Sequence, residues 1–138
     1  MRVTADTNTI VSGSLWHGNP RRILEAAHSG AIELFTSRKL IAELEEVLGR
    51  GKFAAIVSKA ELSPREIVRN YRLVATVIRA EPIDSIVIRD PDDDEVIACA
   101  IASRSEVIVS GDNDLLELKQ YKNIRILTAT ELLLELNL

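Results

Sequence analysis

The chain has 138 residues, 46% of them hydrophobic, and a formal net charge of −4. This length and composition allow a sizeable core and predict one domain over residues 1–138, while the negative charge excludes a protein that holds nucleic acid by overall positive charge. No apolar run reaches the roughly 18 residues of a membrane span, and the opening MRVTADTN lacks the apolar centre of a signal peptide, so a cytoplasmic protein is expected. The single cysteine, Cys99, cannot form an internal disulfide and is expected in the core.

Predicted strands and helices alternate along the chain. Short apolar or β-branched runs predict strands at residues 2–5, 32–36, within 83–88, 107–109 and 124–127. Helices are predicted after Asn19-Pro20, after Ser37, over 64–78, from Asp94 in DEVIACAIAS, near Leu115 and over about 130–136. The alternation predicts an α/β fold, a three-layer α/β/α sandwich with a central parallel sheet of about five strands.

Acidic residues follow two of the predicted strands. Asp6 comes after the first strand, and Asp112 comes after the strand at 107–109. Ligands of open α/β sheets bind beyond the carboxyl ends of the strands. The two aspartates are therefore expected to share one crevice.

Two predicted helices carry further acids. Asp94 shares a helical stripe with Ile97, Ala98 and Ile101, which is expected to face the sheet. In the helix after Ser37, Glu43 and Glu45 lie at opposite edges of the apolar face, so periodicity alone does not choose between them.

Each acid also has a purely structural interpretation. Asp6 is suited to a turn, Asp93 or Asp94 to a helix cap, and Asp114 to a cap of the helix near Leu115. The joint pattern is harder to explain structurally, because carboxylates that converge on one crevice repel each other unless a cation compensates them.

These motifs together resemble the PIN domain. The resemblance rests on ADTN, on a helix of the form S-x-x-L-x-x-E-L-x-x-V-L, on DPDDDEVIACAIA and on VSGDNDLL, and it covers nearly the whole chain. It is closest to the VapC-like toxin components of toxin–antitoxin pairs. The resemblance implies four site acids, which are Asp6, Glu43, Asp94 and Asp112.

The resemblance also assigns auxiliary positions to Asn8, Ser110 and Asp114. Asp93 or Glu95 remains an alternative to Asp94, because both stand beside it in DPDDDE. The resemblance to the PIN domain further implies an endoribonuclease that uses Mg²⁺ or Mn²⁺, the cations favoured by all-oxygen ligands.

Within that implied site, Asp6, Asp94 and Asp112 bind metal, and Glu43 either binds a second ion or holds the attacking water. Asn8 and Ser110 orient ligands or make ordinary turn hydrogen bonds. A cognate antitoxin is implied as a partner. A homodimer is expected from the resemblance and from the apolar run Leu132 to Leu134.

Residues 50–79 carry seven basic and two acidic side chains. In the helix predicted over 64–78, Arg65, Arg69 and Arg72 lie opposite the apolar face. These arginines are expected either to contact an RNA backbone or to form a solvated surface.

Two other kinds of function compete with a nuclease. A phosphoryl-transfer protein also places aspartates at strand ends, but such a phosphatase would have an aspartate where Asn8 stands, and a receiver domain would have a lysine near Ser110-Gly111-Asp112. A non-enzymatic domain that binds RNA or protein would keep the acids without cutting.

Overall fold

The computed structural model describes residues 1–83 and 91–138. Its strands are β1 (Arg2–Ala5), β2 (Glu33–Thr36), β3 (Ala75–Val77), β4 (Val107–Val109), β5 (Gln120–Tyr121) and β6 (Ile124–Leu127). They form one sheet in the order β3-β2-β1-β4-β6-β5, in which every neighbouring pair is parallel except β5 and β6. The described residues thus form six strands where about five were predicted.

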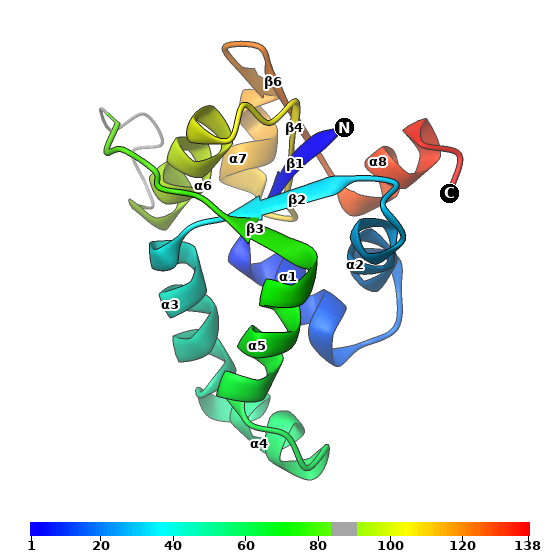
Figure 1. Cartoon of the computed structure of the whole chain (residues 1–138), viewed down its shortest axis with the longest axis vertical. Helices are drawn as coiled ribbons and strands as arrows, with labels where there is room; N and C mark the ends of the chain where they lie inside the picture. Colours follow the sequence, from blue (N-terminus) through cyan, green and yellow to red (C-terminus); the bar gives the residue numbers. More distant parts are fainter. Residues whose placement is uncertain (84–90) are drawn as a thin grey trace.

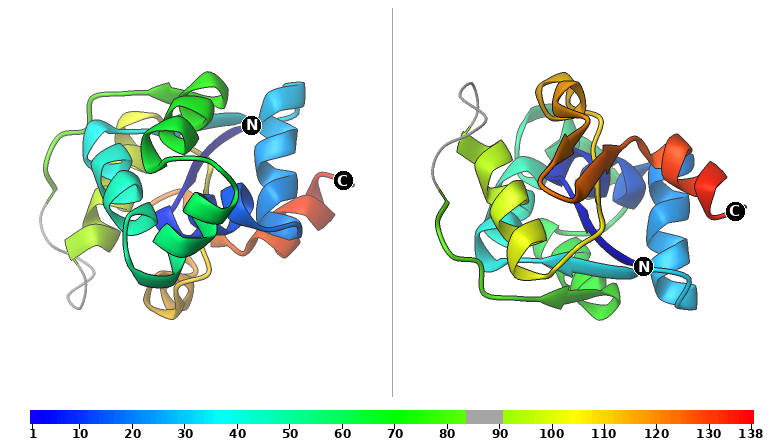
Figure 2. Two further views of the ribbon diagram at one scale, coloured as in Figure 1. Left: turned by 90° about the horizontal axis from the view of Figure 1, so that it is seen from below. Right: turned by 90° about the horizontal axis from the view of Figure 1, so that it is seen from above.

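Helices cover both faces of this sheet (Figure 1, Figure 2). They are α1 (Thr7–Leu15), α2 (Asn19–Ser29), α3 (Arg38–Leu48), α4 (Gly51–Lys59), α5 (Pro64–Val74), α6 (Pro91–Ala102), α7 (Asn113–Leu118) and α8 (Ala129–Glu135). The predicted three-layer α/β/α class is confirmed. Within residues 1–83 and 91–138, none of the helices combines the length and the hydropathy needed to cross a bilayer.

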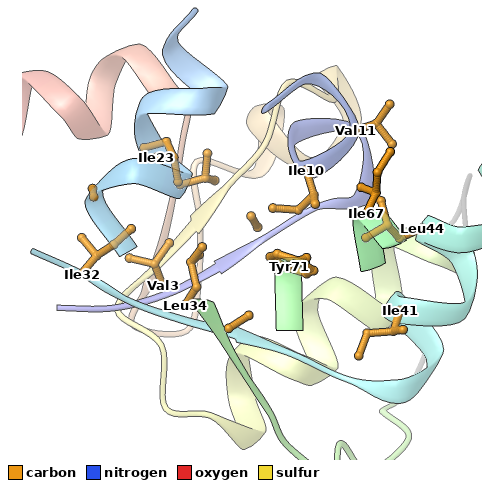
Figure 3. Packing of buried hydrophobic residues seen from close by; sticks show 14 of the residues in the cluster. Val3, Ile10, Val11, Ile23, Ile32, Leu34, Ile41, Leu44, Ile67 and Tyr71 are labelled. Atoms are coloured by element: carbon orange, nitrogen blue, oxygen red, sulfur yellow. The ribbon is translucent and has the colours of Figure 1, made fainter. Parts of the chain in front are cut away.

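Side chains alternate between the two faces along each central strand, as the pleat requires. Val3 and Ala5 of β1 join the core beneath α1, α2, α5 and α8, and Figure 3 shows Val3 beside Leu34 in this core. Ile108 of β4 points the other way, into the core that α6 and α7 cover. Both faces of the central strands are therefore buried, which explains their nearly continuous apolar sequences.

The helix predicted over 64–78 ends earlier than its amphipathic pattern suggested. It stops at Val74, and residues Ala75–Val77 continue as β3, which pairs in parallel with β2. The β-branched Thr76 and Val77 suit a strand, and pairing with the open edge of β2 outweighs the helical periodicity.

Helices α1 and α4 and the two-residue strand β5 were not predicted. Helix α1 begins directly at the end of β1, with Asp6 as its N-cap, in a Thr- and Ser-rich segment that lacks a strong amphipathic pattern. The predicted strand within residues 83–88 lies, apart from Ile83, outside the described residues.

Cys99 lies in the core, as predicted. It is fully buried on α6, and burial raises the pKa of its thiol to about 11. The thiol is therefore protonated at neutral pH and belongs to the packing between α6 and the sheet.

Two leucines of α8 offer a test of the core. Leu132 is fully buried and Leu134 is 71% exposed. We expect Leu132→Ala to lower the free energy of unfolding by about 2–5 kcal/mol, because it leaves a cavity. Leu134→Ala should change it by no more than about 0.5 kcal/mol in urea denaturation. Equal losses in the two variants would contradict this placement of α8.

Candidate functional site

The site is built on the carboxyl ends of β1 and β4, which are neighbours in the sheet. Their parallel register sets Ala5 opposite Val109, so the residues that follow both strands emerge at the same edge. The Asp6 backbone N–H donates to the Val109 carbonyl at 3.0 Å, which extends the pairing by one step. The expected meeting of Asp6 with the segment Ser110 to Asp112 follows from this register.

The Asp6 carboxylate is held by both of its oxygens. Oδ1 accepts a hydrogen bond from the Thr9 backbone N–H at 2.9 Å, and Oδ2 accepts one from the Ser110 hydroxyl at 2.5 Å. Asp6 is 5% exposed. Its orientation is thus fixed from the start of α1 and from the end of β4.

The Ser110 hydroxyl connects the two strand-end aspartates. It donates to Asp6 and accepts a hydrogen bond from the Asp112 backbone N–H at 2.9 Å. Ser110 is 1% exposed, so these bonds form away from competing water. Ser110 therefore makes hydrogen bonds to both strand-end aspartates.

Both strand-end aspartates also cap helices. Asp6 is the N-cap of α1, and Asp112 is the N-cap of α7, where its Oδ1 accepts from the Asp114 backbone N–H at 2.8 Å. The first-turn acid of α7 is Asp114, so the predicted cap of this helix moves from Asp114 to Asp112. The structural and functional interpretations of these acids are therefore compatible, since a cap bond occupies one of the roughly four lone-pair sites of a carboxylate.

Glu43 reaches the same place from α3. Its Oε2 accepts a hydrogen bond from the Thr7 hydroxyl at 2.8 Å, while Glu45 is exposed on the other edge of the helix. Thr7 belongs to the first turn of α1, directly after Asp6. Contact between α1 and α3 thus brings Glu43 to the strand ends.

On α6 the structure brings Asp93 to the site, whereas Asp94 does not line it. Asp93 is 5% exposed, and oxygens of its carboxylate and those of Asp112 and Asp114 lie within 4.8 Å of one another. The helix begins at Pro91, three residues before the expected start. Asp93 therefore lies on the stripe of Val96, Ile97 and Ala100, which are at most 2% exposed.

These side chains line one pocket of about 40 Å³. The described residues that line it are Asp6, Thr7, Asn8, Glu43, Asp92, Asp93, Val96 and Asp112. Apart from Val96, every lining side chain carries oxygen, and most are carboxylates. A small pocket with all-oxygen donors fits a hard divalent cation such as Mg²⁺ or Mn²⁺. We call it the acidic pocket.

Two larger hollows lie close to the acidic pocket. One, of about 310 Å³, shares Asn8 and Asp112 with it and has mostly neutral polar walls. The other, of about 750 Å³, contains Arg72 of the predicted arginine set, but Arg65 and Arg69 do not line it. Its other cations, Arg38, Lys39 and Arg79, were not predicted as site residues, because they belong to segments that only the fold brings together.

A family model described as the PIN domain matches residues 2–114. The match includes every residue that lines the acidic pocket. No curated protein and no solved structure matches the chain.

The bridge made by Ser110 predicts a specific effect on cation binding. Ser110→Ala removes the donor to Asp6 and the acceptor for the Asp112 N–H, and loss of such an outer partner lowers metal affinity by about 10–100-fold. Calorimetric titration with Mn²⁺ measures this change. Ser105→Ala is the matched control, because it removes another buried hydroxyl, which is bonded to Thr4 and does not line the pocket. Unchanged Mn²⁺ affinity in Ser110→Ala would contradict the bridging role.

Proposed function

Since the chain belongs to the PIN-domain family, whose members are generally metal-dependent nucleases, we propose that it hydrolyses RNA phosphodiester bonds with Mg²⁺ or Mn²⁺. One observation carries the proposal: acids from four separate segments of the chain line a single small pocket at the carboxyl edge of the sheet. We assign the site to Asp6, Glu43, Asp93 and Asp112, with Asp93 taking the place first given to Asp94.

The proposed cation ligands are Asp6, Asp93 and Asp112. When bound, a divalent cation would acidify a coordinated water and offset negative charge on the leaving oxygen. The chain's own contribution is to hold the ligands in place before substrate arrives. Thr9 and Ser110 fix Asp6, and the cap of α7 fixes Asp112. Asp114 completes the group of nearby carboxylates as an auxiliary acid.

Glu43 is proposed to hold the attacking water. It lines the acidic pocket from α3, whereas the proposed cation ligands come from the strand ends and from α6. The Thr7 hydroxyl holds one of its oxygens, which fixes the direction of the carboxylate. A carboxylate so placed can accept the proton of a water that attacks phosphorus.

Asn8 is proposed to orient substrate or a bound water. It is exposed at the rim and lines both the acidic pocket and the neutral polar hollow beside it. A phosphatase that forms a phospho-aspartate would need a second carboxylate in this region of the chain, and an amide cannot serve as that acid. This difference favours the nuclease over the phosphoryl-transfer alternative.

We further propose that the chain is the toxin component of a toxin–antitoxin pair and forms a homodimer. The support is the resemblance of its motifs to VapC-like toxins and the exposure of Leu134 on α8, although Leu132 and Leu133 belong to the core. Growth arrest on expression, absent in an Asp93→Asn variant, would support a toxin. Light scattering that finds only a monomer at micromolar concentration would contradict the homodimer.

Adjacent aspartates of α6 provide the matched test of the nuclease. With single-stranded RNA and Mn²⁺, Asp93→Asn should lower the cleavage rate by about a thousandfold or more, because a metal's transition-state stabilisation is worth several kcal/mol. Asp94→Asn should stay close to the wild-type rate, and a chelator should abolish cleavage by the wild type.

Gel analysis of a labelled RNA measures these rates. RNA binding without any cleavage by the wild type would favour the non-cutting alternative. Equal losses in the two variants would remove Asp93 from its proposed role, and cleavage that survives the chelator would remove the metal.

A further inference from the structure

Four cations gather around the hollow of about 750 Å³, which we call the basic groove. They are Arg38 and Lys39 in the first turn of α3, Arg72 in the last turn of α5, and Arg79 shortly after β3. Among the described residues that line it, Glu95 of α6 is the one acid. The groove therefore carries a local positive charge on a chain whose net charge is −4.

The basic groove lies beside the acidic pocket on the same edge of the sheet. Ser37 and Arg38, which follow β2, form part of its wall, and β2 is the neighbour of β1, which ends at Ala5, directly before Asp6. Neighbouring strands are about 4.8 Å apart. The Ser37 side of the groove thus follows the strand next to the one that precedes Asp6.

Helices α3 and α6 contact each other, and each of them supplies lining residues to both features. On α3, Lys39 lines the groove and Glu43 lines the acidic pocket, four residues and about 6 Å further along the helix. On α6, Glu95 lines the groove and Asp93 lines the acidic pocket. A chain of nucleotides that occupies one feature can therefore extend into the other.

Two of the arginines are available for a ligand. Among the described residues, the ion pairs of the groove join Lys39 to Glu95 at 3.4 Å and Arg79 to Glu81 at 3.7 Å, and neither includes Arg38 or Arg72. Both arginines are exposed. Guanidinium groups suit phosphate because their planar donors match its oxygens.

We propose that the basic groove holds the phosphodiester backbone of single-stranded nucleic acid next to the acidic pocket. This inference rests on the proposed nuclease function, and it names the part of the chain that holds the substrate. An acidic pocket repels a polyanion, and cations close to it offset that repulsion while they position the strand. A single strand is flexible enough to bring one phosphate to Asp6 and Asp93, each only 5% exposed, while the adjoining phosphates stay in the groove.

The chain supplies its own control for this proposal. Arg65 and Arg69 are exposed on α5, the helix that carries Arg72, but they do not line the groove. Arg38→Gln with Arg72→Gln removes two groove charges. Arg65→Gln with Arg69→Gln removes the same charge elsewhere, and glutamine keeps much of the side-chain length in both variants.

The experiment measures binding of a fluorescent single-stranded RNA by anisotropy, with Ca²⁺ in place of Mn²⁺, at several salt concentrations. Affinity for a single strand falls with salt in proportion to the phosphates that the protein neutralises, with a slope of about −0.7 for each. The groove variant should bind more weakly and lose about 1.4 from the magnitude of the wild-type slope. The control variant should keep a slope close to that of the wild type.

Equal slope changes in the two double variants would overturn the proposal, as would the absence of RNA binding by the wild type. Duplex RNA bound as tightly as the single strand would overturn its single-strand part, and an acidic peptide that displaces RNA equally well per charge would point to a protein ligand instead. Cleavage is scored separately. If binding depends on the groove but no RNA is cleaved, the nuclease function is rejected and the RNA-binding role of the groove stands. If RNA is cleaved but binding does not depend on the groove, the nuclease function stands and the proposed role of the groove is rejected.

Discussion

The parallel pairing of β1 with β4 brings together residues that are more than a hundred positions apart in the chain. With Ala5 opposite Val109, Asp6 and Ser110 emerge side by side, and the Ser110 hydroxyl binds the Asp6 carboxylate while it accepts from the Asp112 N–H. A shift of this register by one residue would turn the alternating side chains of β1 to the opposite faces. The buried positions of Val3 and Ala5 therefore fix the geometry of the acidic pocket as well as the core.

The carboxylates of the pocket repel one another, but each of them has its own local support from a hydrogen bond or a helix N-terminus. Asp6 and Asp112 accept backbone hydrogen bonds at helix N-termini, Glu43 accepts from Thr7, and Asp93 lies in the first turn of α6, where the helix dipole favours negative charge. Such local support holds the carboxylates close together, in an arrangement that a divalent cation completes. The cost in stability of a crowded acidic pocket is typical of functional sites.

The central strands, and the aspartates that follow two of them, were largely predictable from the sequence. The bounds of β1, β4 and β6 agree with the predicted ranges, because buried apolar runs between turn residues are a strong local signal. Asp6 and Asp112 follow from that reading. Between Asp93 and Asp94 the sequence left the choice open, since the apolar run Val96 to Ile101 gives both of them apolar residues at helical spacing, and only the packing of α6 places Asp93 in the pocket lining. The cations of the basic groove come from α3, from α5 and from the segment after β3, so no local pattern could predict that they lie together.

The central claim is that Asp6, Asp93 and Asp112 surround one divalent cation. The most direct test is a crystal structure of the protein soaked with Mn²⁺, with anomalous diffraction recorded near the manganese absorption edge. The account predicts an anomalous peak in the acidic pocket, within bonding distance of carboxylate oxygens of Asp93 and Asp112 and close to Asp6. A pocket without a peak under conditions that saturate binding in solution, or a peak coordinated by Asp94 in place of Asp93, would contradict it.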